Sequence, residues 1–219
     1  MSQSFFLTFP APPSPSNDVR VVSDASPSAA ADVTALVDRA RRRDPAAFRE
    51  LFRSYVGLVH RVVRRLAGPG PDVEDFVQGA FVEAFRSLPD FRGDALFSTW
   101  LTRITVRVTM HGARRRPPRA LSLDEAAGHA NDEPGPERIA AAREEIVVLE
   151  GLLAEMRPKR RAAFVLHVLE GHSMEEVAAI LNASVSTVKV RVHDARRHIE
   201  RRCKRRPELG DWLGAGWQP

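Results

Sequence analysis

Several residue types are scarce in this sequence, and each scarcity excludes something. The single cysteine, Cys203, cannot form an internal disulfide, which fits a reducing cytosol. No apolar run approaches the ~20 residues that a membrane-spanning helix needs. The N-terminal FFLTFP patch is short, is interrupted by Thr8 and has no basic region before it, so it is a poor signal peptide. These features predict a cytoplasmic protein.

Motifs of catalysis and of metal binding are also missing. There is no P-loop, no HExxH and no cysteine-based metal site. The histidines are scattered, and the pair His167 and His172, like the pair His193 and His198, is five residues apart, so neither pair shares one helical face well. We therefore expect no catalysis, no cofactor and no small-molecule substrate. The alternative is an enzyme that acts on nucleic acid, which a metal-dependent nuclease activity of the pure protein would support.

The sequence carries weak strand signals and a distinct charge pattern. Aromatic residues make up only 7%, whereas the helix formers Ala, Leu and Arg are abundant, so an all-α protein is expected. The net charge is +5, but six Arg and no acid lie in 99–119, and nine Lys or Arg face two acids in 186–206. Between them, 120–137 holds five acids and no base. A surface that is merely solvated does not require positive and negative charges to lie in separate segments. The two basic segments suit a polyanionic partner.

Composition divides the 219 residues into two helical domains, a linker and two tails. The N-terminal stretch is rich in Pro, Ser and Ala without periodicity, and the middle stretch is acidic with Gly, Pro and Asn, so both are read as flexible. The expected division is a tail at 1–31, a first domain at 32–116, an acidic linker at 117–136, a second domain at 137–206 and a tail at 207–219.

Four helices are expected in the first domain, which makes it a small bundle. The first runs over 33–43, and Asp44-Pro45 then provides an N-cap and a proline at the first helical position. Asp72 is the expected cap of the third helix, which Pro89 ends, and the fourth covers 99–112. Residues at three- and four-residue spacing predict the buried faces. They are Phe48, Leu51, Phe52, Tyr55, Val59, Val62, Val63 and Leu66; then Val73, Phe76, Val77, Ala80, Phe81 and Ala84; then Trp100, Leu101, Ile104 and Val108.

The strongest local signal is a helix-turn-helix in the second domain. Ser173 with Glu176 forms a capping box for a short helix that continues to Leu181. Asn182-Ala183 makes a tight turn, and Ser184 is a second N-cap. One face of the next helix is apolar, made of Val185, Val188, Val192, Ala195 and Ile199.

The opposite face of that helix is suited to reading DNA. Hydroxyls and Arg read base edges, cations hold phosphates, and Val190 could touch a thymine methyl. The alternative is that the two helices simply pack and the charges are solvated. The outward and flanking residues are Ser186, Thr187, Lys189, Val190, Arg191, His193, Asp194, Arg196 and Arg197.

These segments resemble a known family. SMEEVAAILNASVSTVKVRVHDARRHI is similar to the promoter-reading region 4 of bacterial sigma factors, and DPAAFRELFRSY, VEDFVQGAF and FRGDALFSTWLTRI followed by ARRR are similar to region 2. Both regions in this order, joined by an acidic linker, resemble the extracytoplasmic-function (ECF) group. The resemblance covers about 33–206. It implies a protein that binds core RNA polymerase and directs it to promoters through −10 and −35 recognition and DNA melting.

The resemblance also assigns roles to residues. The clamp coiled coil of the polymerase is expected to contact Asp72, Asp75, Phe76 and Gln78, and the flap to contact the second domain. The residues expected to contact the −35 element are the helix-turn-helix residues named above and Ser184. The linker acids could imitate RNA charge or merely keep the linker soluble; they are Asp124, Glu125, Asp132, Glu133 and Glu137. A flipped −10 base and its phosphates are expected at Phe91, Phe97, Trp100, Arg103, Arg107, Arg114, Arg115 and Arg116.

Three positions depart from the residues that are common in the family. Arg107 stands where Asn is usual, His111 where an acid is frequent, and Asp194 where Arg is common, so the promoter sequence is not predicted.

An anti-sigma partner is possible, but no residue indicates one. The first rival is a helix-turn-helix regulator that binds DNA without polymerase. The second, a pure interaction protein, does not explain two basic blocks.

Overall fold

The structure is a computed structural model that describes residues 27–114 and 147–204. The acidic linker 117–136, residues 1–26, the C-terminal tail, Arg115 and Arg116 lie outside the described residues. Residues 27–31, which were predicted as the end of the flexible N-terminal tail, are instead the first residues of a helix. Arg114 lies in a described helix, but its side chain is outside them. Within these two ranges every regular element is a helix, which confirms the all-α expectation.

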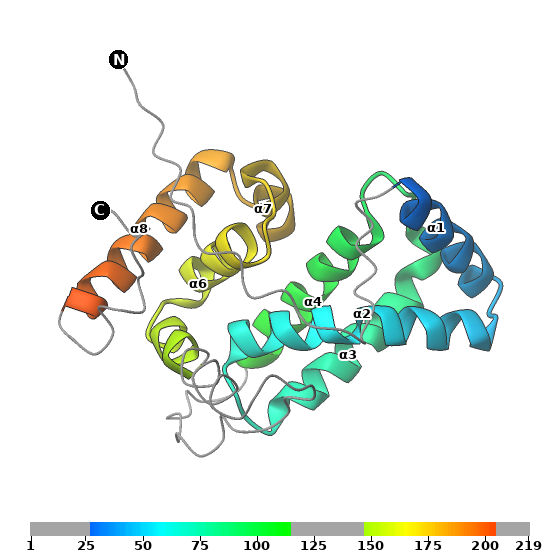
Figure 1. The fold of residues 1–219 in the computed structure, drawn as a ribbon, viewed down its shortest axis with the longest axis horizontal. Helices are drawn as coiled ribbons and strands as arrows, with labels where there is room; N and C mark the ends of the chain where they lie inside the picture. Colours follow the sequence, from blue (N-terminus) through cyan, green and yellow to red (C-terminus); the bar gives the residue numbers. More distant parts are fainter. Residues whose placement is uncertain (1–26, 115–146, 205–219) are drawn as a thin grey trace, which may run out of the picture.

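The first domain, 27–114, is a four-helix bundle, as predicted. Its elements are α1 (Pro27–Arg41), α2 (Pro45–Ala67), α3 (Asp72–Ser87), the short 3₁₀ helix η1 (Leu88–Asp90) and α4 (Phe97–Arg114) (Figure 1). Asp44 caps α2 by accepting bonds from the backbone nitrogens of Ala46 and Ala47 at 2.8 and 3.4 Å. The predicted cap at Asp72 is wrong, since Asp72 is the first residue of α3 and Pro71 holds the cap position without a side-chain bond.

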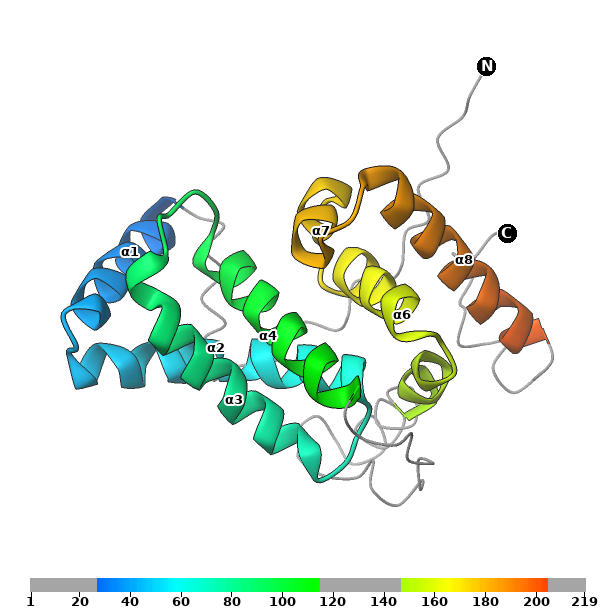
Figure 2. The ribbon, with the colours of Figure 1, turned by 180° about the vertical axis from the view of Figure 1, so that it is seen from behind.

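The second domain, 147–204, begins with a helical segment at 147–154. It continues with α6 (Pro158–Phe164), the π-helical turn η3 (Val165–Leu169), α7 (Met174–Leu181) and α8 (Val185–Lys204) (Figure 2). The capping box of Ser173 and Glu176 is present, and Asn182 ends α7 in the left-handed conformation with φ 47°. Ser184 Oγ accepts from the nitrogen of Thr187 at 3.2 Å, so the second predicted cap is confirmed as well.

The two domains have cores of different composition. In the first, aromatic rings pack together, for example Tyr55 against Phe97 with ring centroids 5.0 Å apart. The core of the second is almost entirely aliphatic, with Phe164 as its one buried ring among the described residues. The predicted apolar faces are largely buried, but Phe52 is 41% exposed, so its placement in the core was wrong.

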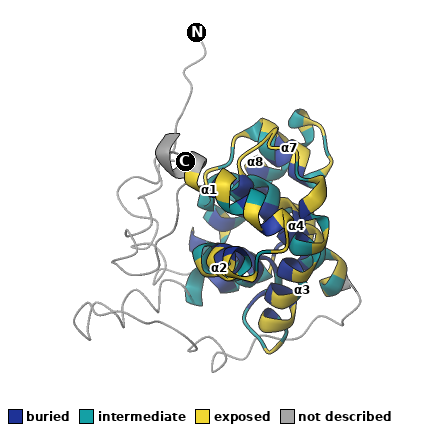
Figure 3. Ribbon diagram, turned by 90° about the vertical axis from the view of Figure 1, so that its right-hand side faces the viewer, coloured by how far each residue is buried: buried dark blue, intermediate teal, exposed yellow. Residues whose placement is uncertain are grey.

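The two domains also pack directly against each other. Helix α4 contacts α7, while α2 contacts α6 and η3. Val62, Leu66 and Val106 of the first domain belong to the apolar core of the second. Figure 3 shows the consequence: buried residues continue from α2 and α4 towards α7 and α8. A pattern along one helix predicts its apolar side but not which partner covers it, so this packing was not expected from the sequence.

Cys203 is buried on the apolar face of α8 near its C-terminal end. Desolvation there raises the pKa of its thiol above the usual 9.0. In the parts of the chain that the structure describes, no helix is both long enough and apolar enough to cross a bilayer.

Candidate nucleic-acid and polymerase interfaces

Helix α8 buries one side and exposes the other, as the sequence predicted. Val188, Val192, Ala195 and Ile199 are buried. Val190 is 61% exposed, which leaves its methyl groups free to meet a partner. Four neighbours are exposed with it: Ser186, Lys189, His193 and Arg197. The candidate face is therefore broad, and it combines hydroxyls, cations and one apolar side chain.

Some predicted reading residues have partners within the protein. Asp194 pairs with Arg160 of α6 at 3.3 Å, so its carboxylate ties α8 to α6. Ser184 bonds with the hydroxyls of Ser186 and Thr187 at 2.9 and 2.7 Å. Arg196 is only partly exposed, and desolvation lowers the pKa of its guanidinium, although Arg stays protonated in proteins. Arg197 is exposed, which makes it the better candidate of the two for a contact with DNA.

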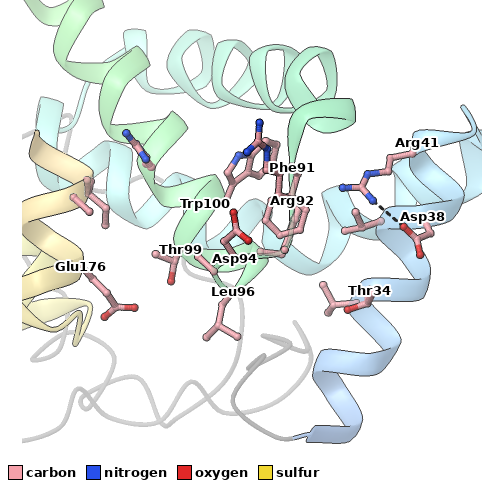
Figure 4. A pocket seen from close by; sticks show the side chains of 18 residues that line it. Thr34, Asp38, Arg41, Phe91, Arg92, Asp94, Leu96, Thr99, Trp100 and Glu176 are labelled. Carbon is pink, nitrogen blue, oxygen red and sulfur yellow. Dashed lines mark hydrogen bonds and ion pairs between the residues drawn. The ribbon is translucent and has the colours of Figure 1, made fainter.

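A pocket of about 760 Å³ lies where α1, the loop 91–96 and the start of α4 meet α7 (Figure 4). Phe91, Phe97 and Trp100 form a contacting trio, with ring centroids 5.1 to 5.7 Å apart. Phe97 is buried, whereas Phe91 and Trp100 are half-buried and line the pocket. Arg41 lies over the Phe91 ring at 5.9 Å from its centroid, which holds this ring from outside. The aromatic set expected at the −10 site thus comes together in space.

Two arginines and a histidine follow one line along α4. Arg103, Arg107 and His111 are exposed and lie four residues apart, so they share one stripe of the helix. Arg103 also lines the pocket. Arg107 pairs with Glu83 of α3 at 2.8 Å. The buried residues of α4 include three threonines that apolar periodicity did not reveal, Thr102, Thr105 and Thr109.

Helix α3 presents part of the predicted polymerase contact. Asp75 and Gln78 are exposed, and Asp72 is half-buried at the start of the helix. Phe76 is only 7% exposed and packs in the bundle, so its side chain can support this surface but not form it. Val82 is 62% exposed and falls four residues after Gln78, on the same side of α3. Val82 was not among the residues predicted for this surface, although its spacing from Gln78 places it on the same side of the helix.

Comparisons with known proteins agree with this architecture. Residues 51–117 match the family model for sigma-70 region 2, and residues 146–199 match that for sigma-70, region 4. The ECF RNA polymerase sigma-E factor of Escherichia coli K12 is 35% identical over an alignment of 174 residues that covers 75% of this chain and 91% of the relative. The sigma-E factor of Haemophilus influenzae is 34% identical over 179 residues, covering 76% and 92% of the two chains.

Two solved structures are similar in fold. CnrH in complex with the cytosolic domain of CnrY has a TM-score of 0.59 at 27% identity, covering 78% of this chain and 97% of the other. The sigma factor RpoE of Bartonella quintana, in complex with the anti-sigma factor NepR, has a TM-score of 0.57 at 18% identity, covering 72% and 96%. Fold, order of regions and sequence together define a protein of the sigma-70 type that carries regions 2 and 4. The chain belongs to the ECF group of RNA polymerase sigma factors.

Proposed function

We propose that this protein binds core RNA polymerase and directs promoter-specific initiation of transcription, without catalysing a reaction itself. Membership in the family supports this function. The observation that carries it is the presence in one chain of two different surfaces that suit nucleic acid: the aromatic pocket with the α4 stripe, and the outer face of α8. Since polymerase and promoter are cytoplasmic in bacteria, the protein works there.

The outer face of α8 is proposed to read the −35 element as a duplex. A recognition helix enters the major groove with its outward side chains. The exposure of Ser186, Lys189, Val190, His193 and Arg197 supports this assignment. Asp194 has a different role in this proposal, since its pairing with Arg160 positions α8. That pairing offers a structural reason for an acid at a position where the family often has Arg.

The pocket and α4 are proposed to hold the −10 element after its strands separate. A base turned out of the duplex needs an aromatic or apolar surface, which Phe91 and Trp100 offer at the pocket, with Phe97 packed against both rings. The stripe of Arg103 and Arg107 could follow the phosphates of a single strand. Arg114, Arg115 and Arg116, whose side chains lie outside the described residues, are proposed to contact phosphates of the same element.

Helix α3 is proposed to dock on the clamp coiled coil of the polymerase. Asp72, Asp75 and Gln78 give the start of α3 an acidic and polar surface, which suits a basic partner. The second domain is proposed to contact the flap. The boundaries predicted from the sequence serve this proposal: 32–116 as region 2, 117–136 as the linker and 137–206 as region 4. An anti-sigma protein is a further proposed partner, because both structural relatives are described in complexes and one of those partners is called an anti-sigma factor.

Run-off transcription with purified core polymerase on a genomic promoter library tests the function. The protein should produce transcripts with defined starts, whereas core polymerase alone should not. Failure to bind core polymerase, or failure to give defined starts, would contradict the proposal. The rival, an independent helix-turn-helix regulator, predicts tight binding of promoter duplex by the protein alone.

Two pairs of variants then test the two assigned surfaces. Arg197→Ala should weaken −35 binding by about 1–3 kcal/mol if it contacts a guanine. Arg53→Ala removes an exposed Arg on α2, far along the chain from α8, and serves as the control for charge. Asp75→Ala should weaken binding to core polymerase, with the exposed Asp90→Ala as its control. Unchanged polymerase affinity in Asp75→Ala would overturn the docking assignment.

A further inference from the structure

One acidic side chain lies on the side of α8 that is assigned to the −35 element. Asp194 comes four residues after Val190, whose side chain is 61% exposed, so the two share one side of the helix. The Asp194 side chain is itself 44% exposed. The exposed residues named above for this face, among them Lys189 and Arg197, are basic or uncharged. A carboxylate that faces DNA phosphates without compensation opposes binding, so its presence here needs a physical reason.

A cation from the neighbouring helix compensates the charge of Asp194. Helices α6 and α8 pack side by side (Figure 1), and Nη2 of Arg160 in α6 donates to Oδ2 of Asp194 at 3.3 Å. The Arg160 side chain is only 29% exposed, and partial removal from water strengthens the attraction between the two charges. The cation therefore offsets the negative charge and also fixes the direction of the carboxylate before DNA binds.

One oxygen of this carboxylate remains available for a partner. Within 27–114 and 147–204, the Asp194 side chain accepts only the bond at Oδ2. An ionised carboxylate accepts hydrogen bonds through both of its oxygens. Oδ1 can therefore accept a hydrogen bond from DNA while Oδ2 stays with Arg160. This division of the two oxygens lets Asp194 hold α8 to α6 and contact a base at the same time.

The major groove offers such an acceptor one favourable base. Guanine presents the acceptors N7 and O6, and thymine presents the acceptor O4, so both repel a carboxylate. Adenine presents its N6 amino donor beside the acceptor N7, whereas cytosine presents its N4 amino donor with no acceptor beside it. A carboxylate that is fixed on a recognition helix therefore selects cytosine.

We propose that Asp194 is a specificity-determining residue of the −35 site: its Oδ1 accepts a hydrogen bond from the N4 amino group of a cytosine, and Arg160 is the positioning residue that holds and neutralises the carboxylate. This inference rests on the proposed function of α8 as the recognition helix. It adds a base identity to that site, because the −35 element then carries a cytosine where Asp194 enters the groove. Arg160 of α6 takes part in recognition without touching a base.

Transcription from a template library tests the base preference. Core polymerase and the protein transcribe templates whose −35 segment is randomised, and a downstream barcode in each transcript identifies its template. The wild type should favour cytosine at one position by about five- to tenfold, the lower end of what a bidentate contact gives, because only one hydrogen bond is made. Asp194→Ala should remove that preference and leave the preferences at the other positions unchanged. Since the side chain is 44% exposed, this variant should keep its helical content by circular dichroism.

Two further variants separate reading from positioning. Asp194→Asn keeps the shape of the side chain but adds an amide donor, and Asn pairs with N6 and N7 of adenine, so the preference should shift from cytosine to adenine. Arg160→Ala leaves the carboxylate unheld and uncompensated, so it should weaken the cytosine preference and lower transcription from every template. Glu200→Ala is the control, because it removes the other acid of α8, which pairs with Lys204 at 2.7 Å, and it should leave all preferences unchanged.

Three results would overturn these assignments. If the wild type favours cytosine at no −35 position, or if Asp194→Ala keeps that preference, the reading role is wrong. If Asp194→Ala lowers transcription from all templates equally, the residue only holds α8 to α6. If Arg160→Ala keeps the full preference, Arg160 is not a positioning residue. A wild-type protein that gives no defined starts from any template would instead contradict the proposed function, so the two failures are distinguishable.

Discussion

Helices α4 and α8 are both basic, yet they are packed in different ways. Helix α8 is covered on one side by its own domain, so Ser186, Lys189, Val190, His193 and Arg197 remain exposed over a broad face. Helix α4 is covered by α2 and α3 on one side and by α7 on another, which leaves little more than a stripe of exposed residues. A broad face suits a duplex groove, whereas a single stripe suits one strand. The difference in packing thus matches the two forms of DNA that the proposal assigns to these helices.

The largest expected effect distinguishes the packed side of α8 from its exposed side. Ile199→Ala removes a fully buried side chain from the packed face and should lower the free energy of unfolding by about 2–5 kcal/mol. Val190→Ala, on the exposed face, should change it by less than about 0.5 kcal/mol. Denaturant unfolding followed by circular dichroism measures both. Similar losses in the two variants would contradict the one-sided packing of α8.

The next effect tests how tightly α4 is enclosed. A Cβ added at Gly112 would meet Cε1 of the buried Phe76 ring. Gly112→Ala should therefore destabilise the protein by about 1–3 kcal/mol through overpacking. Gly151→Ala is the matched control, because nothing lies within 4 Å of its added Cβ. The control should be neutral or stabilising by up to about 1 kcal/mol, and the comparison would fail if Gly112→Ala behaved in the same way.

A smaller effect concerns how α8 begins. Ser184→Ala removes the hydroxyl that accepts from the Thr187 nitrogen, and loss of an N-cap costs about 0.5–2 kcal/mol. Ser186→Ala removes a neighbouring exposed hydroxyl that bonds to the Ser184 hydroxyl but accepts from no backbone nitrogen, so it should lower the midpoint of thermal unfolding less. Equal shifts in the two variants would show that the Ser184 cap does not hold the start of the recognition helix.

The smallest expected effect concerns how the stability of the first domain depends on pH. The side-chain bond from Arg39, followed by the backbone bond from Ala46, lowers the pKa of Asp44 below its usual 3.8. A carboxyl with a lowered folded pKa stabilises the protein above its unfolded pKa and loses this contribution as the pH falls through the folded pKa. The stability difference between the wild type and Asp44→Asn should therefore shrink as the pH is lowered from about 6 towards about 3. A difference that stays constant over this range would show that the Asp44 charge adds nothing.

Local features of the fold were predictable from the sequence because they depend on neighbouring residues. The capping box at Ser173, the cap at Asp44 and the buried face of α8 all follow from spacing along one helix. The outward residues of α8 were predicted by the same logic. Their exposure agrees with that prediction, while their roles in binding remain proposals.

Contacts between distant segments were not predictable in this way. Arg61 and Glu170 are 109 residues apart, and no local pattern joins them. The buried Thr102, Thr105 and Thr109 of α4 are polar, so hydrophobic periodicity did not place them inside. Phe52 was placed in the core because it is apolar and correctly spaced, although it lies at the exposed margin of the buried face. In each case the missing information was the identity of the neighbouring helix.

The burial of Cys203 bears on chemical signalling. Peroxides and disulfides react with the thiolate form of cysteine, and a thiol whose pKa is raised by burial is almost entirely protonated at neutral pH. Because this is the sole sulfhydryl in the sequence, the polypeptide has no second cysteine with which to form an internal disulfide on oxidation. Direct reaction of Cys203 with an oxidant in the folded protein is therefore expected to be slow.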